Sequence, residues 1–255
     1  MQIRGAALLR KVPQVGLLFW IIKLCTTAMG ESTSDFLVFH FNPYAAVISG
    51  LIVFLIVMWL QFRTTKYIPW VYWLNVLTVA IFGTMAADVT HIVLGVPYIV
   101  STIAFAIALA IVFYLWLKSE GTLSIHSITS PRREVFYWAT VLATFALGTA
   151  AGDLFAFTFN LGFLSAGIIF AVIFVIPALG YAIFKWNPIF SFWFAYILTR
   201  PLGASFADWT GKEHAVRGLG WGDGPVAAVL CLLIVIFVGY LQATHEDVDT
   251  TPIER

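Results

Sequence analysis

Four carboxylates recur in this sequence at one fixed spacing. The pattern is Trp, nine residues, Gly, four residues, Asp, and its first copy is Trp20, Gly30 and Asp35. The other copies are Trp73, Gly83 and Asp88; Trp138, Gly148 and Asp153; and Trp193, Gly203 and Asp208. Self-similarity at a regular interval is the signature of an internal repeat. A set of equivalent carboxylates can bind hard cations, because such ions prefer oxygen ligands.

The repeat lies in a strongly apolar chain. Of its 255 residues, 61% are hydrophobic and 11% are charged, against roughly 45–50% and 25% in ordinary soluble domains. A helix needs about 20 apolar residues to cross the hydrocarbon core of a bilayer. Eight segments of suitable length lie near residues 14–34, 43–62, 68–88, 97–117, 134–153, 162–184, 188–207 and 225–243. The sequence therefore predicts an all-α membrane protein with eight transmembrane helices.

Lys and Arg predict the orientation, because cytoplasmic loops carry an excess of these residues. With a cytoplasmic N-terminus, Lys212 and Arg217 would be outside, while Lys23 and Arg200 would lie within the membrane. The cytoplasmic residues would be Arg4, Arg10, Lys11, Arg63, Lys66, Lys118, Arg132, Arg133, Lys185 and Arg255. Both termini are then cytoplasmic, and the four repeat aspartates face the outer side.

The chain is predicted to be one integral membrane domain, residues 1–255, made of two halves. The loop 118–134 separates the half 14–117 from the half 135–243. Because each half has an even number of helices, the halves point the same way. The expected fold is four parallel two-helix repeats in a pseudo-fourfold bundle, unlike the inverted repeats of many transporters. Each short outer connection is expected to close a helical hairpin.

Helical geometry places the repeat residues on one stripe. Residues fifteen apart on a helix differ by about 60° in direction and by about 22 Å in height. The positions seven and eleven after each Trp fall on the same side, and these are Thr27 and Glu31, Ala80 and Thr84, Phe145 and Thr149, and Arg200 and Ala204. With the odd helices around one axis, the stripe becomes a path from a ring of aspartates to Glu31, Thr84 and Thr149, and then to Thr27 and Arg200. The glycines lie off the stripe and suit close packing.

Charged groups within the hydrocarbon usually mark a pathway or an internal ion pair, because their burial is costly. Glu31 and Arg200 are therefore expected to meet near the axis, and Lys23 either belongs to the path or extends to the inner interface. Glu31 and the four aspartates are the candidate metal ligands. The alternative for the aspartates is a structural role at helix ends, and the tryptophans are interpreted as interfacial anchors. His91 is interpreted as a solvent-facing loop residue that could add to a metal site.

The sequence contains no hydrolase, haem or nucleotide-binding pattern, and no basic run suggests nucleic acid. We expect no enzyme activity and no cofactor other than a bound or transported cation. The expected partners are the lipid bilayer and a small ion or solute, and a homo-oligomer is left open.

Four runs carry a family resemblance, residues 23–35, 83–88, 121–127 and 198–209. They resemble a family of multi-pass bacterial inner-membrane proteins catalogued as membrane-anchored or hypothetical. The resemblance covers nearly the whole chain. It implies a bacterial inner-membrane location and lends no activity.

The leading functional hypothesis is a transporter of a small solute, most simply a divalent metal cation moving along the carboxylate-lined axis. Arg200 could be a counter-ion to Glu31 or could indicate an anionic substrate. The alternatives are an ion channel of pseudo-fourfold symmetry and a non-transporting scaffold whose long outer loop binds another protein.

Overall fold

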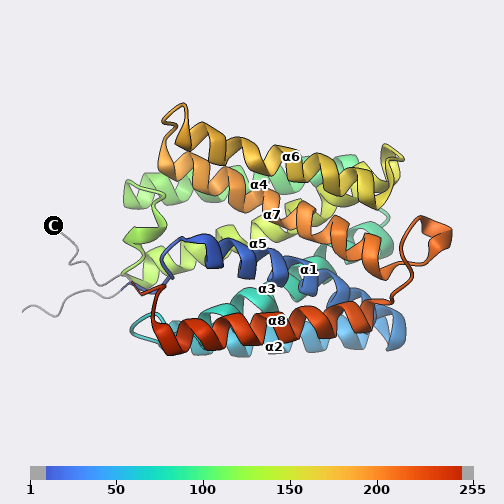
Figure 1. Ribbon diagram of the computed structural model, residues 1–255, viewed down its shortest axis with the longest axis horizontal. Helices are drawn as coiled ribbons and strands as arrows, with labels where there is room; N and C mark the ends of the chain where they lie inside the picture. The colour runs from blue at the N-terminus through green and yellow to red at the C-terminus, as the bar shows by residue number, and fades with distance from the viewer. Residues whose placement is uncertain (1–9, 249–255) are drawn as a thin grey trace, which may run out of the picture.

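The computed structural model describes residues 10–248, and this part of the chain is all-α with eight long helices (Figure 1). They are α1 (Leu17–His40), α2 (Pro43–Arg63), α3 (Pro69–Asp88), α4 (Tyr98–Glu120), α5 (Pro131–Asp153), α6 (Gly162–Ala182), α7 (Pro188–Gly211) and α8 (Asp223–Thr244). The π-helical segments η1 (Val89–Val93) and η3 (Leu154–Thr158) continue α3 and α5. Short 3-10 helices are η2 (Ile125–Ser127) and η4 (His214–Val216). The predicted number and order of long helices are confirmed.

Six of the long helices are long and apolar enough to cross a membrane. They are α2, α3 with the start of η1, α4, α5 with η3, α6 and α8. Helices α1 and α7 have 24 residues each, which is length enough, but they are more polar and are absent from this group. They carry Lys23, Glu31, Arg200 and Asp208, and all four side chains are buried inside the bundle. Packing among the other helices therefore replaces lipid around the polar parts of α1 and α7.

Helices α1, α3, α5 and α7 form a closed ring, in which each contacts the next and α7 returns to α1. The repeat glycines lie at the four contacts. The nearest atom to a Cβ added at each would belong to a residue on the next ring helix, namely Ala80 for Gly30, Phe145 for Gly83, Arg200 for Gly148, and Thr27 for Gly203. Each partner is the residue seven positions after the repeat Trp. The predicted use of glycine for close helix packing is confirmed.

Each even-numbered helix packs chiefly on the odd-numbered helix that follows it, α2 on α3, α4 on α5 and α6 on α7, while α8 packs on α1. The expected hairpins between an odd helix and the next even helix are therefore wrong as packing units. The connection after α3 explains this, because η1 and residues 94–97 lead the chain away from α3 before α4 begins. Large apolar side chains on the outer helices remain exposed, including Leu55, Ile107, Val172 and Ile236.

The first turns of the four ring helices share one aromatic cluster. Phe19 packs on Trp73 with ring centroids 5.6 Å apart, and Tyr137 packs on Trp193 at 6.2 Å. The hydroxyl groups of Tyr72 and Tyr137 are hydrogen-bonded at 2.5 Å. Trp73, Trp138 and Trp193 are at most 4% exposed. Their interpretation as interfacial anchors is wrong, because these rings face the other ring helices and not the membrane surface.

The two ends of the described chain lie at the same end of the bundle as the aromatic cluster (Figure 1). The Gln14 amide donates to the Asp247 carbonyl oxygen at 2.8 Å, and the Tyr67 amide donates to the Arg10 carbonyl at 3.0 Å. Lys11 donates to the buried Glu134 carboxylate at 2.5 Å. Burial raises the pKa of Asp247, although the hydroxyl of Tyr67, which donates to this carboxylate, acts in the opposite direction. Arg4 and Arg255, which entered the orientation argument, lie outside the described residues.

Candidate functional site

The C-terminal parts of the ring helices converge at the end of the bundle opposite the aromatic cluster. We call the five carboxylates gathered there the acidic end: Glu31, Asp35, Asp88, Asp153 and Asp208. They form two groups, in each of which three ligand atoms lie within 4.8 Å of one another. One contains Glu31, Asp35 and Asp208, and the other contains Asp88, His91 and Asp153. The predicted ring of four aspartates is therefore divided into two pairs, each completed by another residue.

Arg200 lies at the centre of the ring, below the acidic end. Its Nη2 donates to the Glu31 carboxylate, to the Thr84 hydroxyl and, at 2.8 Å, to the Thr149 hydroxyl. These three side chains occupy one repeat position, eleven after the Trp, on α1, α3 and α5. The equivalent residue on α7 itself is Ala204. Arg200 therefore links all four ring helices, and the predicted contact between Glu31 and Arg200 is confirmed.

The two threonines around Arg200 are oriented to accept its protons. The Thr84 hydroxyl donates to the Ala80 carbonyl at 2.9 Å, and the Thr149 hydroxyl donates to the Phe145 carbonyl at 3.0 Å. Because a hydroxyl has only one proton, each threonine oxygen is left as an acceptor for the guanidinium group. Each threonine therefore joins Arg200 to its own helix backbone.

Thr27 contributes differently from the prediction. Its carbonyl oxygen accepts a hydrogen bond from Arg200 Nη1 at 3.2 Å, while its hydroxyl donates to the Leu24 carbonyl at 2.8 Å. The side chain therefore does not meet Arg200 as a path-lining hydroxyl. Thr27 packs instead against Gly203 of α7, where an added Cβ would overlap its hydroxyl oxygen and its Cβ.

Lys23 lies on the axis between Arg200 and the aromatic cluster. Its Nζ is 4.1 Å from the centroid of the Phe145 ring and 4.3 Å from that of Tyr196, which are cation–π distances. The side chain is 1% exposed, so the alternative in which it extends to the inner interface is wrong. Phe145, Tyr196 and the Tyr72 hydroxyl pair are also buried. Side chains therefore fill the axis between the acidic end and the aromatic cluster.

Lys212 is the functional candidate that sequence reasoning missed. Its Nζ donates to the Asp35 carboxylate and, at 3.4 Å, to Asp223. Burial lowers the pKa of Lys212, but the carboxylates of Asp35 and Asp208 outweigh it, and the pKa lies above the ordinary value for lysine. The sequence carried one signal for this residue, because Lys212 follows Asp208 by four positions, the spacing of an ion pair on a helix.

His91 lies on η1, and its interpretation as a solvent-facing loop residue is wrong. Its side chain is 4% exposed. Its Nδ1 is 3.7 Å from the Asp153 carboxylate, and its Nε2 is 2.6 Å from the Ser101 hydroxyl of α4. The π-helical continuation of α3 explains the burial, because it keeps His91 on an ordered turn directed at the neighbouring helices α4 and α5.

The acidic end has an excess of negative charge when its groups are ionised. Five carboxylates are accompanied by two cationic side chains, Arg200 and Lys212, which leaves a formal charge of −3, from 2 minus 5. Asp35 and Asp153 are 13% and 16% exposed, so the region is partly open to the end of the bundle. This arrangement attracts cations.

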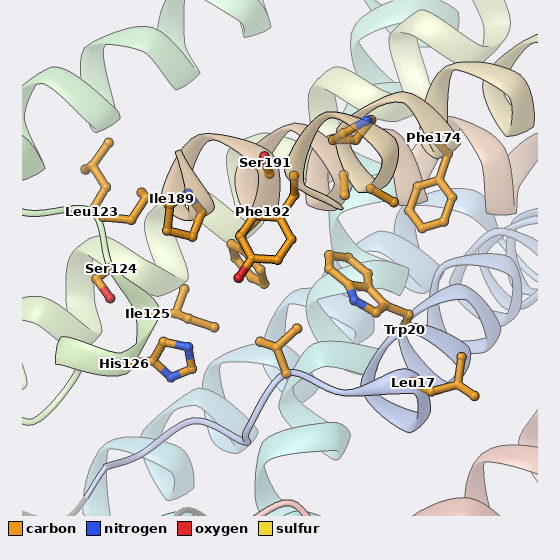
Figure 2. Close-up of a pocket in the computed structure, with 16 residues that line it drawn as sticks. Leu17, Trp20, Leu123, Ser124, Ile125, His126, Phe174, Ile189, Ser191 and Phe192 are labelled. Carbon is orange, nitrogen blue, oxygen red and sulfur yellow. The ribbon is translucent and has the colours of Figure 1, made fainter. Parts of the chain in front are cut away.

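A separate cavity of about 570 Å³ lies near the other end of the ring helices (Figure 2). It lies between Trp20, Phe174 and Phe192 on one side and the loop residues Ser124 and His126 on the other. None of the five carboxylates lines it. This cavity is thus apolar and distinct from the acidic end.

The comparison with protein families matches this chain four times to one model, described as Repeat of Unknown Function (DUF347). The matches are residues 18–67, 71–122, 136–185 and 191–246. The chain belongs to this repeat family. Each DUF347 match contains one ring helix and the even-numbered helix that follows, so the fourfold internal repeat is confirmed. No curated protein and no solved structure matched the chain.

Proposed function

We propose that this DUF347 repeat protein transports a small cation, a divalent metal ion, across a bacterial inner membrane. The observation that carries the proposal is the acidic end itself, an excess of partly exposed carboxylates directly above a buried arginine. An anionic substrate is disfavoured, because Arg200 is already bound to the Glu31 carboxylate. The proposal includes all eight helices crossing the membrane as parallel, pseudo-fourfold related repeats.

The proposed transport cycle uses Arg200 as an internal competitor for the cation. An ion that reaches Glu31, Asp35 and Asp208 repels the guanidinium and takes over its carboxylate partner. Arg200 then loses its ion pair with Glu31 of α1, while it keeps its hydrogen bonds to the hydroxyl groups of Thr84 and Thr149 and to the Thr27 carbonyl. The weaker attachment of α1 to Arg200 would permit α1 to move relative to the other three ring helices, which would open the filled axis toward the aromatic cluster.

A carrier is favoured over the channel alternative because the axis contains Lys23, Phe145 and Tyr196 in van der Waals and cation–π contact. A channel would need all of these side chains to move away together. The scaffold alternative rests on the outer loop after α7, which places exposed Glu213 and Arg217 in solvent. Ion flux separates a transporter from a scaffold.

The flux prediction concerns Asp208, a buried carboxylate at 6% exposure. In proteoliposomes loaded with a Mn²⁺-sensitive dye, we expect slow, saturable Mn²⁺ entry. Asp208→Asn should reduce the initial rate by about 10-fold or more, since losing a charged ligand or partner costs more than about 1.4 kcal/mol. The matched control is Glu213→Gln, an exposed carboxylate of the same end, which should leave the rate unchanged. Absence of any Mn²⁺, Co²⁺ or Zn²⁺ flux in the wild type would leave the scaffold as the better hypothesis.

The proposed orientation places both termini in the cytoplasm. It is supported by the distribution of Lys and Arg outside the bundle interior, where among the described residues only Lys212 and Arg217 lie at the acidic end. The opposite end carries Arg10, Lys11, Arg63, Lys66, Lys118, Arg132, Arg133 and Lys185. This asymmetry is typical of an acidic end that faces outward.

Thiol labelling tests the orientation. Two exposed positions are replaced one at a time in a background without Cys25 and Cys231, Glu213→Cys at the acidic end and Lys185→Cys at the opposite end. A membrane-impermeant maleimide applied to intact spheroplasts should label position 213 and should label position 185 only after lysis. The reverse pattern would invert the topology, and labelling of both from outside would contradict a membrane between them.

A further inference from the structure

We infer that Asp88, His91 and Asp153 form a binding site for one divalent transition-metal ion. The inference deepens the proposed function, because it lies on the proposed path and names the class of ion. Binding is nevertheless measurable without transport, so either proposal can fail while the other stands.

The first argument is the convergence of three acceptor groups. One ligand atom from each residue lies within 4.8 Å of the other two, and His91 Nδ1 is 3.7 Å from Asp153 Oδ2. In the described part of the chain, no donor lies within hydrogen-bond distance of the Asp88 or Asp153 carboxylate or of His91 Nδ1. The histidine side chain is 96% buried, from its 4% exposure. A buried polar atom without a partner is costly unless a ligand or proton completes it.

The second argument is the tautomer of His91. The Ser101 hydroxyl lies 3.0 Å from the Tyr98 carbonyl and 3.4 Å from the Pro97 carbonyl, so its single proton is donated to the backbone of α4. At 2.6 Å, Nε2 of His91 must then donate its own proton to the Ser101 oxygen. Nδ1 is left with a lone pair that faces two carboxylates. This is the arrangement of a metal-binding histidine whose other nitrogen is fixed by an outer hydrogen bond.

The third argument is the backbone around the site. The Leu94 amide donates to the Val89 carbonyl at 3.1 Å, and the Phe159 amide donates to the Leu154 carbonyl at 3.0 Å, both five residues apart. Among the described ring helices, only α3 and α5 continue in this π-helical form, and these two supply Asp88 and Asp153. Single π-helical turns are frequent at functional sites. The Tyr98 ring packs on the imidazole at 4.4 Å and holds it against Ser101.

The ligand set selects the ion. One imidazole nitrogen and two carboxylates suit Mn²⁺, Fe²⁺, Co²⁺ and Zn²⁺, whereas Mg²⁺ and Ca²⁺ prefer oxygen ligands alone. The other group of the acidic end differs, because Glu31 and Asp35 already have Arg200 and Lys212 as counter-charges. Metal bonds of about 2.0–2.2 Å would draw these ligand atoms closer together than the 4.8 Å within which they now lie.

The experiment is Co²⁺ and Mn²⁺ titration of the purified, untagged full chain in detergent. We expect one ion per chain, a visible Co²⁺ absorption with nitrogen ligation, and little competition from a tenfold excess of Mg²⁺. His91→Gln should weaken binding by at least about 100-fold. Ser101→Ala, which removes only the group that fixes the tautomer, should weaken it by about 10–100-fold. The matched control His40→Gln, an exposed histidine at the end of α1, should bind as the wild type does.

Pulsed EPR of Mn²⁺ on the wild type gives a second measurement that needs no variant to fold. A coupled imidazole nitrogen is expected. An Mn²⁺ signal without nitrogen coupling, equal affinity for Mg²⁺, or unchanged Co²⁺ binding in folded His91→Gln protein would each overturn the site. Binding as expected without flux in proteoliposomes would support the site and reject the transporter, whereas wild-type flux together with unchanged Co²⁺ binding in His91→Gln would support the transporter and reject the site.

Discussion

Replacing Arg200 with glutamine is expected to lower the free energy of unfolding by about 3–5 kcal/mol, the range for breaking a buried ion pair. The loss of stability comes from the polar groups around Arg200, which remain buried after the guanidinium is removed. The Glu31 carboxyl group would be left in the bundle interior without its partner, and the oriented oxygens of Thr84 and Thr149 would lose their donor. Unfolding in mixed micelles with increasing SDS, followed by tryptophan fluorescence, measures the loss.

A double-mutant comparison separates this ion pair from general damage to the core. Glu31→Gln with Arg200→Gln should cost less than the sum of the two single changes, because neither charge is then left alone. Arg217→Gln is the matched control, an exposed arginine beyond the same end of α7, and should change stability by less than about 0.5 kcal/mol. Additive single effects would contradict the conclusion that Arg200 and Glu31 act as one pair.

The sequence predicted the ring interior well because helical periodicity alone decides which side chains share a face. Positions seven and eleven after the repeat Trp were expected on the inward stripe, and Arg200, Glu31, Thr84 and Thr149 meet there. The glycine contacts followed from the same geometry. Both predictions needed only the rotation per residue and the assumption of one common axis.

Helical periodicity could not predict which helices pack together or how the turns between them run. The pairing of each even-numbered helix with the next odd one is decided by the course of the outer turns, as at η1. The same turn buries His91, which in sequence lies beyond the apolar segment. The burial of Trp73 and Trp138 was missed because hydropathy identifies a membrane segment but not which of its faces meets lipid.

The second large effect is expected for a repeat glycine of α5, and the same helix supplies the control. Gly148 faces α7 so closely that an added Cβ would overlap the Cβ and Cγ of Arg200 and lie 2.9 Å from Pro201 Cδ. These atoms belong to the base of one side chain and to a proline ring, and neither can rotate away. Gly148→Ala is therefore expected to cost about 1–3 kcal/mol, the usual range for overpacking.

Gly152 is the matched control, one turn further along α5. A Cβ there would meet only Pro201, at 3.9 Å, which is ordinary van der Waals contact. Since alanine is favoured over glycine inside a helix by roughly 0.5–1 kcal/mol, Gly152→Ala should be neutral or stabilising in the same SDS unfolding measurement. The difference in sign between two glycines four residues apart is specific to a ring in which α5 and α7 pack at Gly148. Equal effects at the two positions would mean that both substitutions act only through the helix propensity or flexibility of α5. The close contact between Gly148 and Arg200 would then be absent from the folded protein.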